Sequence, residues 1–298
     1  MTIGRFAPSP SGRMHLGNVF TALLAWLSVR SQNGTMLLRI EDLDPERSKR
    51  EYIDALKYDL AWLGLDWDKE MPQQSSREAA YRSCFEKLST YPCYCTRSEL
   101  HDASAPHASD GRTIYAGTCR NLTEEERTQK SRKPAWRVRV PNQDISFYDG
   151  VFGAYSENLA AQCGDFIVRR SDGVYAYQLA VVCDDAFGGV TEVVRGCDLL
   201  SSTPRQIWLY QTLSLPIPKF YHVPLLVAPD GKRLSKREKS LDMEHLRSTN
   251  TPEEIIGRLA YAANLIDREV PIRAEELISL FSWNKIGKES IEIRSEPV

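Results

Sequence analysis

Two short stretches, far apart in the chain, carry residue types that suit a nucleotide. The first is Arg5-Phe6-Ala7-Pro8-Ser9-Pro10-Ser11-Gly12-Arg13-Met14-His15-Leu16-Gly17-Asn18, and the second is Pro229-Asp230-Gly231-Lys232-Arg233-Leu234-Ser235-Lys236-Arg237. A neutral histidine can donate a hydrogen bond to a phosphate oxygen, and a glycine lets a phosphate approach the backbone. The second stretch begins as a turn and continues as a basic loop. Together the stretches predict two halves of one ATP site.

The elements around the first stretch explain why it could bind a phosphate. The apolar residues Ile3 and Phe6 predict a strand, the following Pro, Ser and Gly residues end it, and residues 19–29 show helical spacing. His15 and Gly17 therefore lie where a strand leads into a helix. The first turn of a helix has unpaired N–H groups and a partial positive charge, which favour an anion.

Carboxylates follow a second apolar run, Met36 to Ile40, which predicts a buried strand. In open α/β sheets, ligands bind at the carboxyl ends of the strands, so Glu41 is placed to meet an amino group. The alternative is an acidic N-terminal cap for the helix after Pro45. That alternative stays open above all for Asp42 and Asp44.

A third apolar run, residues 189–196, predicts a buried strand that carries Arg195 at its end. Such an arginine either reaches water or grips a carboxylate through two parallel hydrogen bonds, and Arg5 could serve the same pocket. Residues 165–170 and 174–182 predict two strand-like runs around a Ser-Asp-Gly turn, and the second could become helical after Tyr177. We expect Tyr175, in the same run, to be an ordinary core aromatic.

Cysteines supply the candidate metal ligands. Cys93, Cys95 and Cys119 could give three thiolates to a tetrahedral zinc ion, which needs one more ligand. Chemistry alone favours His101 or His107 as the fourth ligand, and buried thiols without a metal are the alternative. The other cysteines lie outside any ligand spacing and are expected in the core: Cys84, Cys163, Cys183 and Cys197.

The composition of the chain limits the classes of protein to which it can belong. The chain has 298 residues, of which 42% are hydrophobic and 26% charged, as in ordinary globular proteins of roughly two domains. The formal net charge of −2 argues against a uniformly basic coat for nucleic acid, although a local basic face is compatible with it. No membrane span or signal segment is evident, so we expect a cytoplasmic protein whose seven cysteines form no disulfide framework.

The two stretches resemble the His-x-Gly-His-type and Lys-Met-Ser-Lys-Ser-type signatures of class I aminoacyl-tRNA synthetases. The segment Arg-Phe-Ala-Pro-Ser-Pro-Ser-Gly is similar to the corresponding segment of the glutamyl branch of this class. The resemblance runs from about Gly4 to Arg237. It departs at Asn18, where many class I enzymes have a second histidine. The short remainder after Arg237 is similar to the paralogues that glutamylate queuosine in tRNA(Asp), which lack the large anticodon-binding region of glutamyl-tRNA synthetases.

This resemblance implies an α/β fold: a Rossmann-type class I synthetase catalytic domain with a zinc-bearing insertion and a short helical C-terminal region. The expected boundaries are 1–91 and 161–240 for the two halves of the catalytic domain, 92–160 for an acceptor-type insertion that carries the zinc, and 241–298 for a helical region without a full anticodon-binding domain.

The resemblance also assigns residues to roles. His15 and Lys236 are the expected catalytic residues, and the expected ATP site comprises His15, Gly17, Asn18 and Lys236. The expected glutamate site comprises Arg5, Ser9, Glu41, Tyr177 and Arg195. The expected zinc ligands are Cys93, Cys95, Tyr115 and Cys119, because the family pattern is Cys-x-Cys followed by Tyr-x-x-x-Cys.

The implied reaction joins glutamate to ATP as glutamyl-adenylate, with Mg²⁺, and then transfers glutamate to the queuosine of tRNA(Asp). We expect a monomer with no membrane partner. A rival hypothesis is a truncated glutamyl-tRNA synthetase that charges the tRNA 3′ end; by family resemblance, such enzymes need tRNA before they activate glutamate. A second rival is a nucleotidyl transferase that is independent of glutamate, and a third is a catalytically inactive zinc-containing RNA-binding module.

Overall fold

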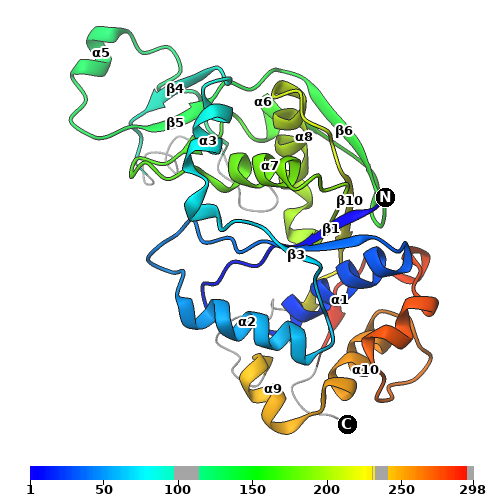
Figure 1. The fold of residues 1–298 in the computed structure, drawn as a ribbon. Helices are drawn as coiled ribbons and strands as arrows, with labels where there is room; N and C mark the ends of the chain where they lie inside the picture. Colours follow the sequence, from blue (N-terminus) through cyan, green and yellow to red (C-terminus); the bar gives the residue numbers. More distant parts are fainter. Residues whose placement is uncertain (97–113, 230, 232–240, 294–298) are drawn as a thin grey trace.

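Parallel strands cross the middle of the molecule, with helices above and below them in Figure 1. The computed structural model describes residues 1–96, 114–229, 231 and 241–293. One sheet has the order β1 (Ile3–Phe6), β2 (Thr35–Leu38), β3 (Lys69–Glu70), all parallel. The N–H of Thr191 donates to the carbonyl of Ile3 at 2.9 Å and so attaches a second sheet at the β1 side.

The second sheet has the order β7 (Gly153–Asn158), β6 (Asp144–Asp149), β10 (Lys219–Val223), β9 (Glu192–Gly196). Its strands β6, β10 and β9 run parallel to one another, and β7 returns antiparallel to β6. The range 92–160, which we expected to be an insertion, therefore contains two strands of the sheet that holds β9. The domain boundaries given above remain a prediction.

Helix α1 (Leu16–Ser31) lies at the centre of the larger hydrophobic core. It packs on β1 and β9 and is covered on its other side by η4 (Ala274–Leu280). Burial from both sides explains why its apolar residues are not confined to one face. The indole N–H of Trp283 also donates to the hydroxyl of Ser28 at 3.1 Å, which ties the C-terminal segment to this helix.

The remaining helices surround the strands, and α10 begins with a capping box formed by Thr251 and Glu254. They are α2 (Arg50–Trp62), η1 (Gln74–Ser76), α3 (Glu78–Phe85), α5 (Glu124–Thr128), α6 (Leu159–Gln162), α7 (Tyr177–Phe187), η2 (Cys197–Ser202), α8 (Thr203–Thr212), α9 (Met243–Thr249), α10 (Pro252–Ala262) and η5 (Trp283–Lys285). Among the described residues, no helix is long and apolar enough to cross a membrane.

The structure decides between the two alternatives for the run 174–182. The helical alternative is confirmed, because α7 begins at Tyr177, and residues 174–176 lie outside the named strands. The segment that starts at Arg273 forms the 3₁₀ helix η4. The C-terminal region is also not purely helical, since β12 (Ile291–Glu292) pairs in parallel with β11 (Leu226–Val227).

A small antiparallel sheet lies at the upper left of Figure 1, on the far side of α3 from β1. Its order is β4 (Thr90–Cys93), β5 (Ala135–Val138), β8 (Ile167–Arg169). This sheet places Cys93 at the end of β4, away from the parallel strands that cross the middle of the molecule. The candidate metal ligands and the candidate nucleotide residues are therefore carried by different sheets.

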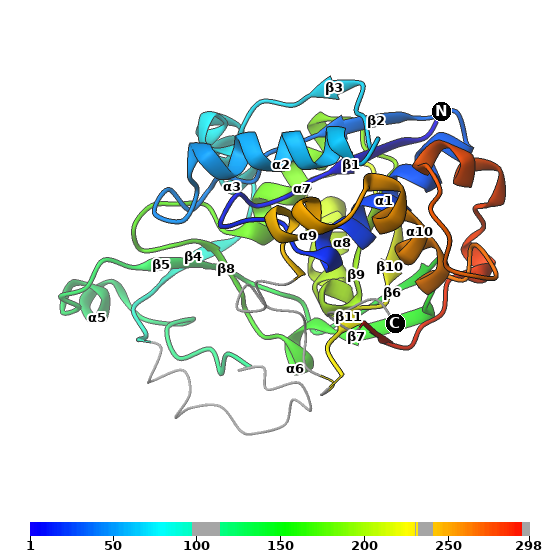
Figure 2. The same ribbon diagram turned by 90° about the horizontal axis from the view of Figure 1, so that it is seen from below.

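Helix α9 lies beside α2 on the face that Figure 2 shows, and one ion pair joins them. The guanidinium of Arg247 is 2.8 Å from Asp59 Oδ1, and Asp59 is only 2% exposed. Burial raises the pKa of Asp59 to about 6, against the opposing effect of Arg247. The folded state thus binds a proton at Asp59 more tightly than the unfolded state does.

We predict a pH dependence of stability that comes from Asp59. Because its folded pKa is raised, its contribution is most favourable below about pH 4 and is lost as the pH rises to about 6. Replacement Asp59→Asn should remove a change of up to about 3 kcal/mol in the free energy of unfolding between these limits, measured by urea denaturation at each pH. The control Asp54→Asn, in the exposed Arg50 pair of the same helix, should leave the pH profile unchanged. An Asp59→Asn profile parallel to wild type would contradict this assignment.

Candidate active site

A cavity of about 780 Å³ lies where β1, β2 and β9 end and α1 begins. It brings together all the residues predicted for glutamate and ATP that the structure describes: Arg5, Ser9, His15, Gly17, Asn18, Glu41, Tyr177 and Arg195. Lys236 lies outside the described residues. Since these residues come from segments separated by up to 190 positions, the fold is what makes them neighbours. Their individual roles remain predictions.

The N-terminus of α1 faces this cavity. His15 is the N-cap residue, and its backbone N–H donates to Asn18 Oδ1 at 3.1 Å. Asn18 therefore has a structural task in this chain, because its carbonyl closes the first helical turn. A Cβ at Gly17 would lie 3.1 Å from the ring of His15, so glycine is what allows the imidazole to lie against this turn.

Arg5 is held at the end of β1 by groups on two other elements. It is 5% exposed, and its Nη1 donates to the carbonyl of Val194 at 3.1 Å. Its Nε lies 3.5 Å from Asp185 Oδ1 on α7. These contacts fix the guanidinium between β9 and α7 at one wall of the cavity.

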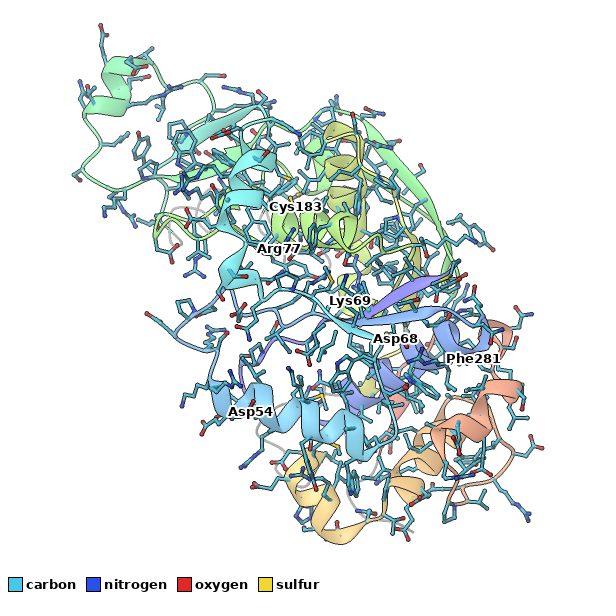
Figure 3. All side chains as sticks on the ribbon, viewed as in Figure 1. Asp54, Asp68, Lys69, Arg77, Cys183 and Phe281 are labelled. Carbon is cyan, nitrogen blue, oxygen red and sulfur yellow. The ribbon has the colours of Figure 1, made fainter. Side chains whose placement is uncertain are left out.

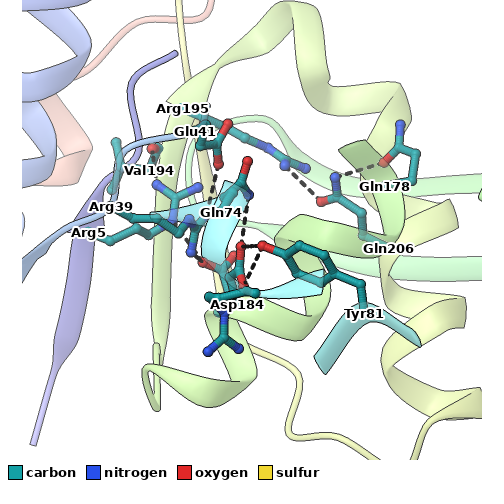
Figure 4. Close-up of polar contacts among 12 residues, drawn as sticks. Arg5, Arg39, Glu41, Gln74, Tyr81, Gln178, Asp184, Val194, Arg195 and Gln206 are labelled. Atoms are coloured by element: carbon teal, nitrogen blue, oxygen red, sulfur yellow. Dashed lines mark hydrogen bonds and ion pairs between the residues drawn. The ribbon is translucent and has the colours of Figure 1, made fainter. Parts of the chain in front are cut away.

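A second buried arginine, Arg39, was not identified as a site residue from the sequence. It is 0% exposed, and it bonds to Asp185 and, at 3.0 Å, to Glu41 (Figure 4). Burial opposes the charge of Asp185, but Arg39 and Arg5 outweigh it and lower the pKa of this carboxyl. Two guanidiniums and two carboxylates thus form a compact buried group with no net charge.

Glu41 is the member of this group that reaches the cavity. Its pKa is raised by burial, an effect that Arg39 only partly offsets. None of these acids caps α2, since its N-cap is Lys49, but Asp44 Oδ1 accepts from the N–H of Arg47 at 3.3 Å in the turn that follows Pro45. Asp42 instead accepts hydrogen bonds from the backbone and the hydroxyl of Ser75, at 2.9 and 2.5 Å, and so anchors η1.

The neighbouring carboxylate, Asp184, organises the elements behind the cavity. It is 0% exposed and accepts from Gln74, Arg77 and Tyr81 at 2.6–3.1 Å. Figure 3 shows Arg77 beside α7, next to Cys183, and Figure 4 shows Asp184 with Gln74 and Tyr81. Asp184 thus joins α7 to η1 and α3, while Asp185 joins α7 to the ends of β1 and β2.

The hydrogen-bonding partners of Arg195 differ in kind from those of Arg5 and Arg39. It is 5% exposed, and it donates from Nε to His222 Nε2 at 3.0 Å, from Nη1 to Gln206 at 2.7 Å and from Nη2 to Thr203 at 2.7 Å. Among the described residues no carboxylate forms an ion pair with it, and burial lowers its pKa. A buried guanidinium that forms no ion pair favours an anion in the cavity that it lines.

Tyr177 and Tyr175 lie in different surroundings. Tyr177, the first residue of α7, lines the cavity, and burial raises the pKa of its hydroxyl, which therefore stays neutral. Tyr175 is 3% exposed and lies edge-to-face against Tyr81 and Phe85, with ring centroids 5.9 Å apart in both cases. Tyr175 is a core aromatic.

The predicted zinc ligands gather at the end of β4. The sulfur atoms of Cys93, Cys95 and Cys119 all lie within 4.8 Å of one another. The hydroxyl of Tyr115 is 3.5 Å from Cys93 Sγ, and it also accepts from the N–H of Cys119 at 2.7 Å. Burial and the adjacent Cys93 raise the pKa of Cys95 to about 12, so three thiolates here would need a cation. The cluster fits a metal ion; His101 and His107 lie outside the described residues.

Arg137 is a further member of this cluster that the sequence did not reveal. Its Nε donates to Cys93 Sγ at 3.2 Å, and its guanidinium lies 3.7 Å from the ring centre of Tyr115. The cation stabilises negative charge on the sulfur and holds the tyrosine ring in place. Cys84, Cys163, Cys183 and Cys197 lie outside the cluster, and all seven cysteines are free.

Comparison with known proteins connects this geometry to a family. The protein-family model for the catalytic domain of class I tRNA synthetases (E and Q) matches residues 2–290 of this chain. A glutamyl-Q tRNA(Asp) synthetase from Symbiobacterium thermophilum is 47% identical over 100% of this chain and 98% of its own length. The chain belongs to the glutamyl-Q tRNA(Asp) synthetase family. Another member, from Nitratidesulfovibrio vulgaris, is 48% identical over 95% of this chain and 92% of its own length.

Solved structures of related synthetases share the fold of this family member. A glutamate-tRNA synthetase from Elizabethkingia anophelis matches 98% of this chain and 68% of its own, with a TM-score of 0.83 and 27% identity. A glutamate tRNA ligase from Elizabethkingia meningosepticum, solved in complex with its amino acid, matches 98% of this chain and 66% of its own, with a TM-score of 0.81 and 27% identity. This chain spans about two thirds of those proteins, and the predicted α/β class I synthetase fold is confirmed.

We predict that Asp185 is among the most sensitive positions for stability. Replacement Asp185→Asn leaves two buried guanidiniums short of a counter-charge and should cost about 3–5 kcal/mol in the free energy of unfolding, measured by urea denaturation. The control Asp172→Asn breaks only the exposed pair with Arg170, 2.6 Å apart, and should cost less than about 1 kcal/mol. Similar losses for both variants would show that the buried group is not a major source of stability.

Proposed function

We propose that this protein activates L-glutamate with ATP and transfers it to the queuosine of tRNA(Asp). The observation that carries the proposal is the pair of guanidiniums, Arg5 and Arg195, in one cavity, of which Arg195 has only uncharged partners. Glutamate brings a side-chain carboxylate that supplies the missing counter-charge, whereas the amide of glutamine does not. Sequence identity of 47% to a glutamyl-Q tRNA(Asp) synthetase over the full chain supports the acceptor.

The cavity has a polar part and an apolar part, as an amino acid and a nucleotide together require. Its polar part is formed by Arg5, Glu41, Tyr177 and Arg195, and its apolar part includes Ala22, Ala25, Leu56, Leu60, Leu225 and Leu226. We assign the first to glutamate, with Glu41 against the α-ammonium, and the second to adenine. His15 and the N-terminus of α1 together offer hydrogen-bond donors and positive charge that suit the phosphates of ATP.

Activation requires an α-carboxylate oxygen of glutamate to attack the α-phosphorus of ATP while the bond to pyrophosphate breaks. The protein contributes orientation and stabilisation of negative charge on the phosphate oxygens. We assign this task to His15 and the α1 N–H groups, and to Lys236 on its sequence motif alone. Mg²⁺ bound to the phosphates supplies further positive charge. A hydroxyl of queuosine then attacks the adenylate carbonyl carbon, and AMP leaves.

A smaller cavity of about 330 Å³ adjoins the first and shares Ser9, Glu41 and Tyr177 with it. Arg47 and Arg170 border this smaller cavity, with side chains that are 77% and 50% exposed. Such cations suit RNA phosphates. We therefore assign the smaller cavity to the approach of the acceptor nucleoside. We further propose that the protein is cytoplasmic and acts as a monomer.

We assign a structural Zn²⁺ to Cys93, Cys95, Tyr115 and Cys119. Thiolates are preferred zinc ligands, and the three sulfur atoms are close enough to share one ion. The hydroxyl of Tyr115 lies 3.5 Å from Cys93 Sγ, which places an oxygen ligand beside the three sulfur atoms. The ion would fix residues 93–95 against residues 115–119.

Glutamate-dependent exchange between pyrophosphate and ATP, measured without RNA, tests the activation step. We predict exchange in the wild type, because the cavity has its glutamate groups in place without RNA. Lys236→Ala should lower the rate on the order of 100-fold, since a charge opposite the phosphates is lost. The control Lys133→Ala, at an exposed position, should retain full activity.

Exchange that appears only when tRNA(Glu) is added would instead favour the truncated glutamyl-tRNA synthetase. Exchange that does not depend on glutamate would favour another nucleotidyl transferase. Absence of exchange under every condition would favour a zinc-containing RNA-binding module.

Metal analysis of the purified protein tests the zinc assignment. We predict one zinc per chain for the wild type, and loss of zinc in Cys119→Ser, because a serine hydroxyl is a much poorer ligand than a thiolate. Cys163→Ser is the matched control, since Cys163 lies outside the cluster, and it should keep its zinc. Equal zinc contents in the two variants would refute the assignment.

A further inference from the structure

Arg195 rests on a chain of buried groups that none of the predicted roles includes. His222, on β10, accepts the Nε–H of Arg195 at 3.0 Å through its Nε2 atom. Its other ring nitrogen, Nδ1, lies 2.6 Å from Asp149 Oδ2, at the end of β6. Both His222 and Asp149 are 0% exposed. The three groups thus form one line from the second sheet into the cavity.

The carboxylate of Asp149 is held rigidly and stays ionised. Its Oδ1 accepts from the backbone N–H groups of Val151 and Phe152 at 3.0 and 2.9 Å. Burial alone would raise the pKa of Asp149, but the hydrogen bonds from His222 and from these N–H groups lower it. An ionised carboxylate can only accept, so the Nδ1 atom of His222 must carry the proton.

His222 therefore presents Nε2 as an acceptor only while its ring is neutral. Burial and the neighbouring charge of Arg195 lower the pKa of His222, whereas Asp149 and Asp198 act in the opposite direction. In the neutral ring with hydrogen on Nδ1, the Nε2 lone pair faces the Nε–H of Arg195. The carboxylate of Asp149 thus fixes the acceptor role of a ring that touches the guanidinium.

The partners of Arg195 also determine which of its donors remain. A guanidinium has five N–H groups. Three of them bond to His222, Gln206 and Thr203, which leaves one on each terminal nitrogen. Gln206 is itself oriented, because its amide donates to Gln178 at 2.8 Å (Figure 4). Each terminal nitrogen of the guanidinium thus keeps one N–H that can be donated to an oxygen of a ligand carboxylate.

We propose that Asp149 and His222 are positioning residues that set the affinity and selectivity for glutamate, by orienting Arg195 through a neutral imidazole. The imidazole separates Asp149 from the guanidinium, so that the ion pair with Arg195 is left for a carboxylate of the ligand. The inference rests on the proposed role of Arg195 in the glutamate site. It adds two residues from strands that the sequence motifs do not touch.

The variant Asp149→Asn tests this mechanism with little change in shape. The Oδ1 of the new side chain can still accept from Val151, from Phe152 and, at 3.3 Å, from the backbone N–H of His222, while its amide now faces His222 Nδ1 as a donor. His222 would then carry its proton on Nε2 and oppose the Nε–H of Arg195. We expect the Kd for glutamate, from calorimetric titration of the full chain without ATP or RNA, to rise about tenfold or more.

Two comparisons separate this mechanism from a general structural role. Asp144→Asn, at an exposed position of the same strand, should leave the Kd within about twofold. In a His222→Gln background, the glutamine can adapt its amide to either neighbour, so adding Asp149→Asn should change the Kd by less than about threefold. The KM for ATP in the exchange assay should stay within about twofold in every variant, and the urea midpoints verify folding.

A folded Asp149→Asn variant with wild-type affinity for glutamate would overturn the proposal, and so would an equal effect in the His222→Gln background. If Asp149→Asn does not fold, His222→Phe replaces it and should weaken binding about tenfold or more, while His222→Gln should stay within about threefold. Equal binding by these two variants would also overturn the proposal.

The titration separates this inference from the proposed function. If the wild type binds glutamate but transfers none to tRNA(Asp), the proposed function fails and the positioning role is still decided by these variants. If the wild type binds no glutamate, both are overturned.

Discussion

The ion pairs of Asp185 are the interaction on which the rest of the site depends. Asp185 lies on α7, and it bonds to Arg39 after β2 and approaches Arg5 at the end of β1. Three elements that meet at the cavity are thereby joined by buried charges, where removal of one partner leaves another uncompensated. Glu41 enters the same group through Arg39, so the carboxylate proposed to meet the ammonium of glutamate is positioned by the same charges.

The two arginines of the cavity are stabilised in different ways, and the difference has a functional meaning. Arg5 approaches a carboxylate of the protein, and its charge is balanced before any ligand enters. Arg195 bonds to an imidazole, an amide and a hydroxyl, none of which balances its charge. A ligand carboxylate would therefore gain most at Arg195, while Arg5 would contribute direction. This division fits an amino acid that must be distinguished from its amide.

Sequence motifs predicted the residues that line the cavity. His15 and Gly17 could be placed because turn residues between a strand and a helix are visible locally, and Glu41 and Arg195 because each ends an apolar run. The start of α7 at Tyr177 was less certain, since the run 174–182 is apolar and β-branched in part and its spacing suits either structure. Only the packing of α7 on α3 and α8 decides it.

The supporting residues could not be found in this way. Arg39 lies inside an apolar run, and His222 lies between Tyr221 and Val223 on a buried strand, so neither has a local pattern that names its partner. Their partners Asp185 and Asp149 are 146 and 73 positions away in the chain. Such pairs are determined by tertiary structure. Asn18, in contrast, has a local signal, since a side chain three residues after an N-cap can close the first turn.

Transfer of labelled glutamate to tRNA(Asp) tests the central claim most directly. The protein is incubated with ATP, labelled glutamate and one of three RNAs: intact tRNA(Asp) with queuosine, the same RNA without its 3′-terminal adenosine, and tRNA(Asp) that lacks queuosine. Our account predicts that labelling persists without the 3′ adenosine and is lost without queuosine. Labelling that requires the 3′ adenosine and ignores queuosine would contradict it.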